Sequence, residues 1–128
     1  IDFTLTLPGL FEVEKIQKVG QRYNTQILSK VIFSFTPDIV MSPLALPKHI
    51  LHPWVDELLP TAKGAMHDVL TQLKMRPTFA EQWPDEYQAG LKKGKARIEM
   101  LEQIRKDTYT MRDILSMRED ALQWWEAI

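Results

Sequence analysis

The stretch DEYQAGLKKGKARIEMLEQIRKDTYTMRDILSMREDALQWWEAI, residues 85–128, decides the fold that we expect for this chain. It contains no proline, and its last glycine is Gly94. Apolar residues recur in steps of three and four, so they return to one face of a helix. The pattern predicts a single long helix over residues 86–126, with a heptad seam formed by Leu101, Ile104, Thr108, Met111, Leu115, Arg118, Leu122 and Trp125.

A second apolar row widens this stripe beyond the seam of a two-stranded coiled coil, which favours packing in a bundle or on a partner. At 1.5 Å per residue, a helix over residues 95–125 would be about 45 Å long. A compact domain of this size is only about 28–30 Å across. We therefore expect part of the helix to project or to lie along another chain. The second row consists of Ile98, Ile114, Met117, Ala121 and Trp124.

Length and composition limit the class of protein. A chain of 128 residues, with 45% apolar and 26% charged residues, is typical of one globular domain over residues 1–128. Its formal net charge of −1 argues against a protein that coats nucleic acid or an anionic membrane. The absence of cysteine excludes a disulfide framework, thiol catalysis and cysteine-ligated zinc.

The same features bear on location. No apolar run is long enough to cross a bilayer, since the richest one, residues 27–46, is interrupted by Lys30, Asp38 and two prolines. The sequence begins with Ile1, as a chain does after removal of a targeting peptide or when it is the ordered part of a longer protein. We expect an intracellular protein, with an organelle such as the mitochondrion as one candidate location.

The first residues predict an extended arm over residues 1–9. Phe3, Leu5 and Leu7 alternate with polar residues, and Pro8-Gly9 ends the pattern. A strand must pair with another strand, and the rest of the sequence predicts few strands. The arm is expected either to reach a neighbouring subunit or to pack on its own domain.

Residues 10–32 predict the first of three principal helices in a mainly α-helical fold. The β-branched and aromatic run over residues 27–35 also suits a strand, and we favour a helix to about Lys30 with an extended exit. The helical spacing is carried by Leu10, Val13, Ile16, Val19, Tyr23, Ile27 and Val31.

A Pro-rich apolar segment over residues 36–60 connects this helix to the next. Its five prolines predict irregular structure, and its many apolar side chains must be buried either across the helices or against a partner. The second principal helix is predicted over residues 61–75 and is stopped by Pro77. Thr78 and Glu81 match a capping box, which predicts a short helical turn.

Residues that could carry chemistry give no catalytic or metal site. His49 and His52 lie three residues apart and His67 follows, but without the frame of a metal motif, so we favour surface or packing roles. The carboxylate pairs, such as Asp56-Glu57, are adjacent and would point to different faces of a helix. We expect no cofactor and no enzymatic activity.

A basic cluster over residues 92–97 is the sharpest local charge feature. Four cations, Lys92, Lys93, Lys95 and Arg97, have no acid between them. Near the amino-terminal end of a helix they oppose its dipole, which favours contact with a polyanion, RNA before duplex DNA. The alternative is a solvated surface cluster.

Two tryptophans near the carboxyl end are candidate anchors for a partner, because large rings are enriched in interface hot spots. The alternative is that the helix end docks on its own core. The residues that we predict to bind a protein partner are Leu101, Ile104, Met111, Leu115, Leu122, Trp124, Trp125 and, from the Pro-rich segment, Trp54.

Three functional hypotheses follow. The first is a non-catalytic subunit of a larger assembly, such as a supernumerary subunit of an organellar ribosome or a respiratory complex, that binds partners through the long helix and the Pro-rich segment. The second is an RNA-associated protein that uses the basic cluster. The third is an enzyme or ligand carrier that uses the three histidines. Self-association is compatible with the first.

Overall fold

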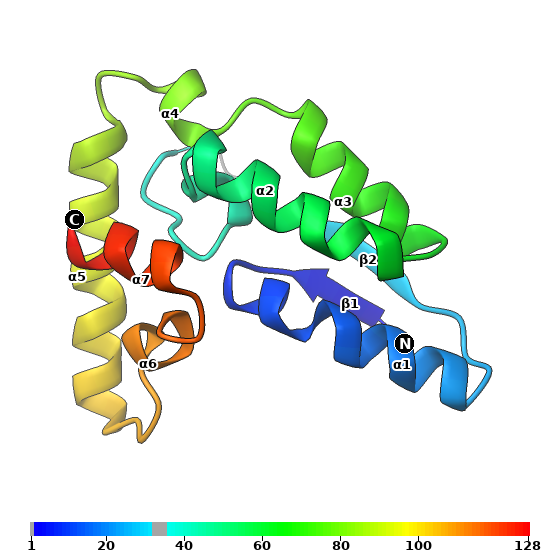
Figure 1. Cartoon of the computed structure of the whole chain (residues 1–128). Coiled ribbons are helices and arrows are strands. Elements are labelled where there is room, and N and C mark those ends of the chain that lie inside the picture. Colours follow the sequence, from blue (N-terminus) through cyan, green and yellow to red (C-terminus); the bar gives the residue numbers. More distant parts are fainter. Residues whose placement is uncertain (1, 32–35) are drawn as a thin grey trace.

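The computed structural model describes residues 2–31 and 36–128 of the chain. Helices dominate these residues, and the strands found among them form one two-stranded parallel sheet. The mainly α-helical fold predicted from the sequence is therefore confirmed. Figure 1 shows two groups of elements, one gathered around the sheet and one, from residue 87 onward, standing beside it.

The amino-terminal residues form a strand–helix–strand unit. Strand β1 (Asp2–Leu5) leads through a 3-10 turn, η1 (Pro8–Glu12), into helix α1 (Val13–Arg22) and then into strand β2 (Leu28–Val31). The two strands are parallel, and the helix between them provides the crossover that parallel pairing requires. The predicted extended arm is thus a strand for residues 2–5, and it pairs with β2 of its own chain.

The helix predicted over residues 10–32 is wrong beyond residue 22. Asn24 has a left-handed backbone (φ 48°), and this conformation ends a helix. The chain returns along α1, and Thr25 donates its N–H to the Gly20 carbonyl at 2.9 Å. The alternative of a strand over residues 27–35 is confirmed for β2, and residues 32–35 lie outside the described residues.

The Pro-rich segment is more regular than predicted. It contains the 3-10 turn η2 (Pro43–Ala45), helix α2 (Lys48–Leu58) and the 3-10 turn η3 (Leu59–Thr61). Most of its prolines stand at or before the first positions of these elements, where a missing N–H costs little, and Pro53 alone lies inside a helix. The apolar residues of the segment are buried within this chain, which removes one argument for a partner. They include Val40, Leu44, Leu46, Ile50, Leu51, Trp54, Val55 and Leu58.

The second principal helix and the short turn after it agree well with the sequence. Helix α3 (Ala65–Met75) begins a few residues later than predicted. Helix α4 (Phe79–Gln82) begins with the predicted capping box between Thr78 and Glu81. In Figure 1, α2 and α3 run side by side above the sheet, and α1 lies below it.

The single helix predicted over residues 86–126 is wrong. Helix α5 (Tyr87–Arg105) ends where Lys106 adopts a left-handed backbone (φ 53°), and the Asp107 N–H donates to the Glu102 carbonyl at 3.0 Å. Helix α6 (Met111–Leu115) then begins with a capping box between Thr110 and Asp113, and α7 (Glu119–Glu126) follows. Figure 1 shows both short helices folded back beside α5.

The return of the chain along α5 is fixed by polar contacts. The capping box already satisfies the Asp113 N–H at the start of α6. The Glu102 carboxylate satisfies a second one, because it accepts the Met111 N–H at 2.5 Å. The Lys95 ammonium donates to the Trp125 carbonyl at 2.7 Å and lies 5.4 Å from the centre of the Trp125 ring. Lys95 thus binds the carboxyl end of α7 as well as its aromatic face.

Two glycines let the segment before η2 cross directly over α5. A Cβ atom on Gly90 would lie 2.8 Å from the Pro37 carbonyl oxygen, and one on Gly94 would lie 2.7 Å from Val40 Cγ1 and closer still to the Asp38 carbonyl oxygen. Both distances are too short for a carbon atom. The close contact between the two backbones therefore requires glycine, which has no side chain, at positions 90 and 94.

We predict that Gly94→Ala lowers the free energy of unfolding by about 1–3 kcal/mol, the usual cost of overpacking. Helix propensity alone predicts a gain of about 1 kcal/mol, so the sign of the change separates the two effects. Urea unfolding followed by circular dichroism measures it. Lys92→Ala, on the exposed side of the same helix, is the control and should change the stability by less than about 0.5 kcal/mol. A stabilised Gly94→Ala variant would contradict the close crossing.

Candidate functional site

The residues predicted to bind a partner divide into two groups. Trp54, Met111, Leu115 and Trp125 are buried in the core, and Leu122 and Trp124 are partly buried. Only Leu101 and Ile104 are exposed. The buried members therefore stabilise the fold of this chain, in agreement with the alternative of a helix end docked on its own core. The exposed pair stays a prediction for partner binding.

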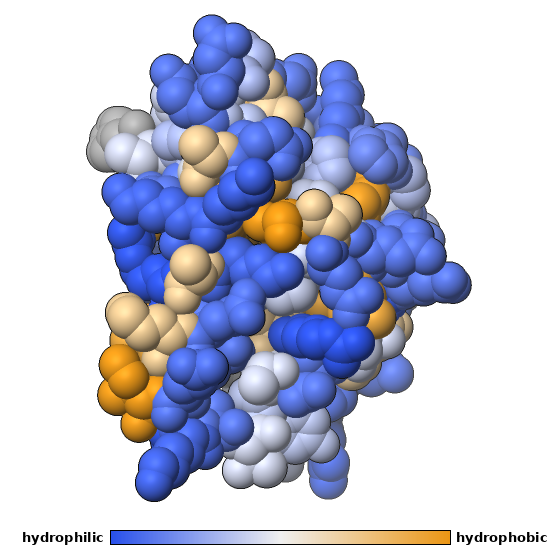
Figure 2. All heavy atoms as spheres, turned by 90° about the vertical axis from the view of Figure 1, so that its left-hand side faces the viewer, coloured by the Kyte–Doolittle hydropathy of each residue, from blue (hydrophilic) through white to orange (hydrophobic). Residues whose placement is uncertain are grey.

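The exposed pair belongs to a larger apolar surface, which we call the α5 ridge and define as Met100, Leu101 and Ile104. Ile104 is 70% exposed and Met100 is 52% exposed. In Figure 2 apolar atoms appear low on this face of the molecule, at the level of the carboxyl end of α5 in Figure 1. Adjacent large apolar residues on one helix that reach solvent are typical of an interaction site.

The α5 ridge continues a side of the helix that the chain covers higher up. Arg97 precedes Met100 and Leu101 by one helical turn, so it lies on the same side as they do. Gly94, two turns before Leu101, is covered on that side by residues 38–40, and the exposed Arg97 pairs with Asp38 at the edge of this segment. The α5 ridge begins one helical turn after the ion pair between Arg97 and Asp38.

Cations surround the ridge. Arg97 and Lys93 approach the Asp38 carboxylate at 3.3 and 3.9 Å, and Arg105 pairs with Asp107 at 2.9 Å. A hydrogen bond from the Thr36 hydroxyl, assisted by the two cations, lowers the pKa of Asp38. Glu99 and Glu102 lie on the same stretch of helix, so the charges around the ridge are of both signs.

The basic cluster is partly used inside the chain. Lys93 and Arg97 contact Asp38, and Lys95 binds the carboxyl end of α7. For Lys92, the structure gives no partner among the described residues. The polyanion site proposed from the sequence stays a prediction, and most of its cations have structural contacts already.

Arg118 stabilises the fold through contacts that the heptad pattern does not predict. The heptad seam counted it as a core position of a continuous helix, whereas it precedes α7 and reaches across to α2. Its guanidinium pairs with Glu57 at 2.5 Å and Asp120 at 2.8 Å, and lies 4.8 Å from the centre of the Trp54 ring. The hydrogen bonds to Glu57 raise the pKa of Arg118 further above its already high value.

The three histidines do not form a metal site in the part of the chain that the structure describes, where no group of three metal-ligating residues is found. His49 and His67 are exposed. His52 lies in α2, and its Nε2 atom is buried without a hydrogen-bond partner. Burial, with a smaller effect of Lys48 and Lys74, lowers the pKa of His52.

Comparison with known proteins adds no relationship, since no protein-family model, curated protein or solved structure matches this chain. Among residues 2–31 and 36–128, none of the helices combines the length and apolar character needed to span a membrane. The candidate site therefore rests on the geometry of the α5 ridge.

We predict that Trp125→Ala lowers the free energy of unfolding by about 3–5 kcal/mol, because the ring is 2% exposed and its loss would leave a cavity. Ile104→Ala is the comparison on the exposed ridge and should change stability by less than about 0.5 kcal/mol. Chemical unfolding of both variants measures the difference. A Trp125→Ala variant as stable as the unaltered chain would contradict this prediction and favour a role for Trp125 in binding a partner.

We also predict that His52 makes stability depend on pH. As the pH falls below 6.5, the unfolded chain takes up the histidine proton before the folded chain does, so the free energy of unfolding decreases. The effect levels off below the lowered pKa of the folded state. Urea unfolding from about pH 5 to pH 8 should show this slope in the unaltered chain and in His67→Gln, but not in His52→Gln. The same slope in all three would contradict the assignment.

Proposed function

We propose that this chain is a non-catalytic subunit of a larger assembly and that its α5 ridge binds an amphipathic helix of a partner protein. The observation that carries the proposal is the exposure of Met100, Leu101 and Ile104 together on one side of a helix. Helix–helix recognition of this kind places apolar side chains of one helix between those of another.

The energetics suit such a contact. Full burial of one Met, Leu or Ile side chain stabilises a complex by about 1.5–3 kcal/mol before the costs of association. The three ridge residues therefore form the apolar centre of an interface, and the charged residues around them form its rim. Tyr109 and Met117, in the connections after α5 and α6, are exposed as well and add apolar surface to this part of the chain.

Cations near the ridge offer contacts to acidic residues of a partner. Lys93, Arg97 and Arg105 are exposed and lie along the same helix as the ridge. Carboxylates on a partner helix would form ion pairs with these cations when the apolar side chains of that helix contact the ridge. The partner that we propose is thus an amphipathic helix with apolar residues at helical spacing and acidic residues beside them.

The identity of the assembly is a finer part of the same proposal. An organellar ribosome or a respiratory complex is the kind of assembly that we propose, with the mitochondrion as the corresponding location. The RNA-associated alternative draws on the basic cluster, but Lys93, Lys95 and Arg97 already contact groups of this chain, so it has less support.

The test uses a matched pair of substitutions that add the same charge on opposite sides of α5. We predict that Ile104→Asp weakens association with the partner at least about 30-fold, the loss expected at an interface hot spot. Gln88→Asp, at an exposed position on the opposite side of α5 from Ile104, should change it by less than about threefold. Neither substitution should alter thermal unfolding much, because both side chains are exposed.

A photo-crosslinking residue at position 104, in the full chain and in the cells that express it, would identify the partner before affinities are measured. The expected product is one dominant adduct with a protein that contains an acidic amphipathic helix. Equal association of the Ile104→Asp and Gln88→Asp variants with that protein would overturn the proposal. So would a dominant adduct with RNA, which would favour the alternative.

A further inference from the structure

Thr36 carries an exposed hydroxyl at the start of the segment that crosses α5. Pro37 follows it, and the sequence contains one other place where Ser or Thr directly precedes Pro, at Ser42-Pro43. Thr36 lies in a bend outside the helices and strands, whereas Ser42 is completely buried. The two dipeptides therefore share a sequence pattern but differ in accessibility.

A proline directly after a hydroxyl residue defines the substrates of one class of protein kinase. These proline-directed kinases bind the segment around the modified residue in an extended form. Pro37 disfavours a helical conformation of Thr36, and both residues reach solvent. Thr36-Pro37 therefore meets the requirement on the surface of the folded chain, and Ser42-Pro43 does not.

Two cations of α5 lie close to this hydroxyl. The Thr36 hydroxyl donates to Oδ1 of Asp38, and Oδ2 of the same carboxylate lies 3.3 Å from Arg97 Nη2 and 3.9 Å from Lys93 Nζ. The side chains of Lys93 and Arg97 are 70% and 45% exposed. A single carboxylate thus separates the Thr36 oxygen from two accessible cations, and a phosphate on that oxygen is within reach of both.

We propose that Thr36 is a phosphorylation site for a proline-directed protein kinase and that Lys93 and Arg97 bind the phosphate. The kinase transfers the terminal phosphoryl group of ATP to the Thr36 Oγ1 atom. A bond forms between Oγ1 and that phosphorus, and the bond between the phosphorus and the oxygen that joins it to ADP breaks. ADP leaves, and the hydroxyl proton passes to the catalytic base of the kinase.

Charge favours the contact between the phosphate and α5. Among the ion pairs of the described residues, Lys93 and Arg97 contact Asp38 and no other carboxylate. A phosphorylated threonine carries a charge of about −1.5 to −2 and three acceptor oxygens, and Arg binds such a group through two parallel hydrogen bonds. Once modified, Thr36 no longer donates to Asp38, so Asp38 competes less well for Arg97. The inference is independent of the α5 ridge and of any partner helix.

The first test treats the folded full chain with a recombinant proline-directed kinase and ATP. We expect one phosphate per chain by intact mass, located on Thr36 by fragmentation, and none in Thr36→Val, which keeps the shape of the side chain without the hydroxyl. Ser42 is the internal control and should stay unmodified, because it is buried. No phosphate on the folded chain, or equal modification of Thr36 and Ser42, would overturn the phosphorylation site.

The second test measures the second pKa of the phosphate by ³¹P NMR, in a chain made with phosphothreonine at position 36 so that no kinase is needed. Arg97→Gln should raise this pKa by about half a unit or more, because loss of a nearby cation disfavours the doubly charged form. Arg105→Gln is the matched control, since it removes the same charge two helical turns further along α5, about 12 Å away. It should change the pKa by less than about 0.2. Equal pKa values in the unaltered chain and in Arg97→Gln would overturn the proposed contact with α5.

Discussion

The close crossing of residues 37–40 over Gly90 and Gly94 is the constraint on which the rest of this structure depends. It brings backbone onto backbone, which leaves no freedom in the position of α5 relative to the elements around the sheet. It also places Asp38 beside Lys93 and Arg97. The side of α5 that the crossing segment covers is stabilised internally, and the side beyond it is left as the α5 ridge.

The sequence predicts those elements whose signals are local. The capping box at Thr78 and the apolar spacing of α3 agree with the structure because both depend on residues within a few positions. The break after α5 was missed because Lys106 adopts a left-handed conformation without being glycine or asparagine. A local signal was nevertheless present, since Thr110 and Asp113 have the spacing of a capping box inside the predicted helix.

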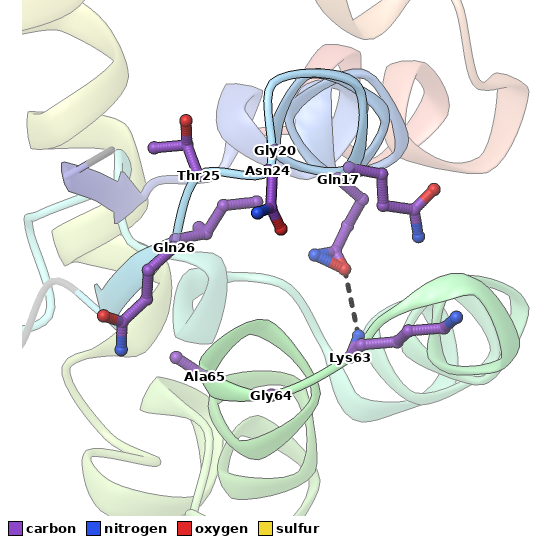
Figure 3. Close-up of a pocket in the computed structure, with 10 residues that line it drawn as sticks. Gln17, Gly20, Asn24, Thr25, Gln26, Lys63, Gly64 and Ala65 are labelled. Carbon is purple, nitrogen blue, oxygen red and sulfur yellow. Dashed lines mark hydrogen bonds between the residues drawn. The ribbon is translucent and has the colours of Figure 1, made fainter.

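The candidate sites could be predicted only in part, for a related reason. Spacing along the helix placed Leu101 and Ile104 on one surface with Leu115 and Trp125, but which of them reach solvent depends on how α6 and α7 fold back. The position of α6 and α7 depends on contacts such as that between Lys95 and Trp125. Such a contact cannot be predicted from the periodicity of the sequence. The same holds for Gln17 and Lys63, which are 46 residues apart in sequence and are joined by a hydrogen bond (Figure 3).

The arrangement has a consequence for the order in which the chain acquires its structure. The β1–α1–β2 unit closes over a short stretch of chain, whereas the pairs Arg97–Asp38 and Arg118–Glu57 join residues 59 and 61 positions apart. Long closures cost more entropy and form later. Because the chain leaves the ribosome from its amino-terminal end, we expect this unit to form before α5 emerges and α5 to dock against elements that have already folded.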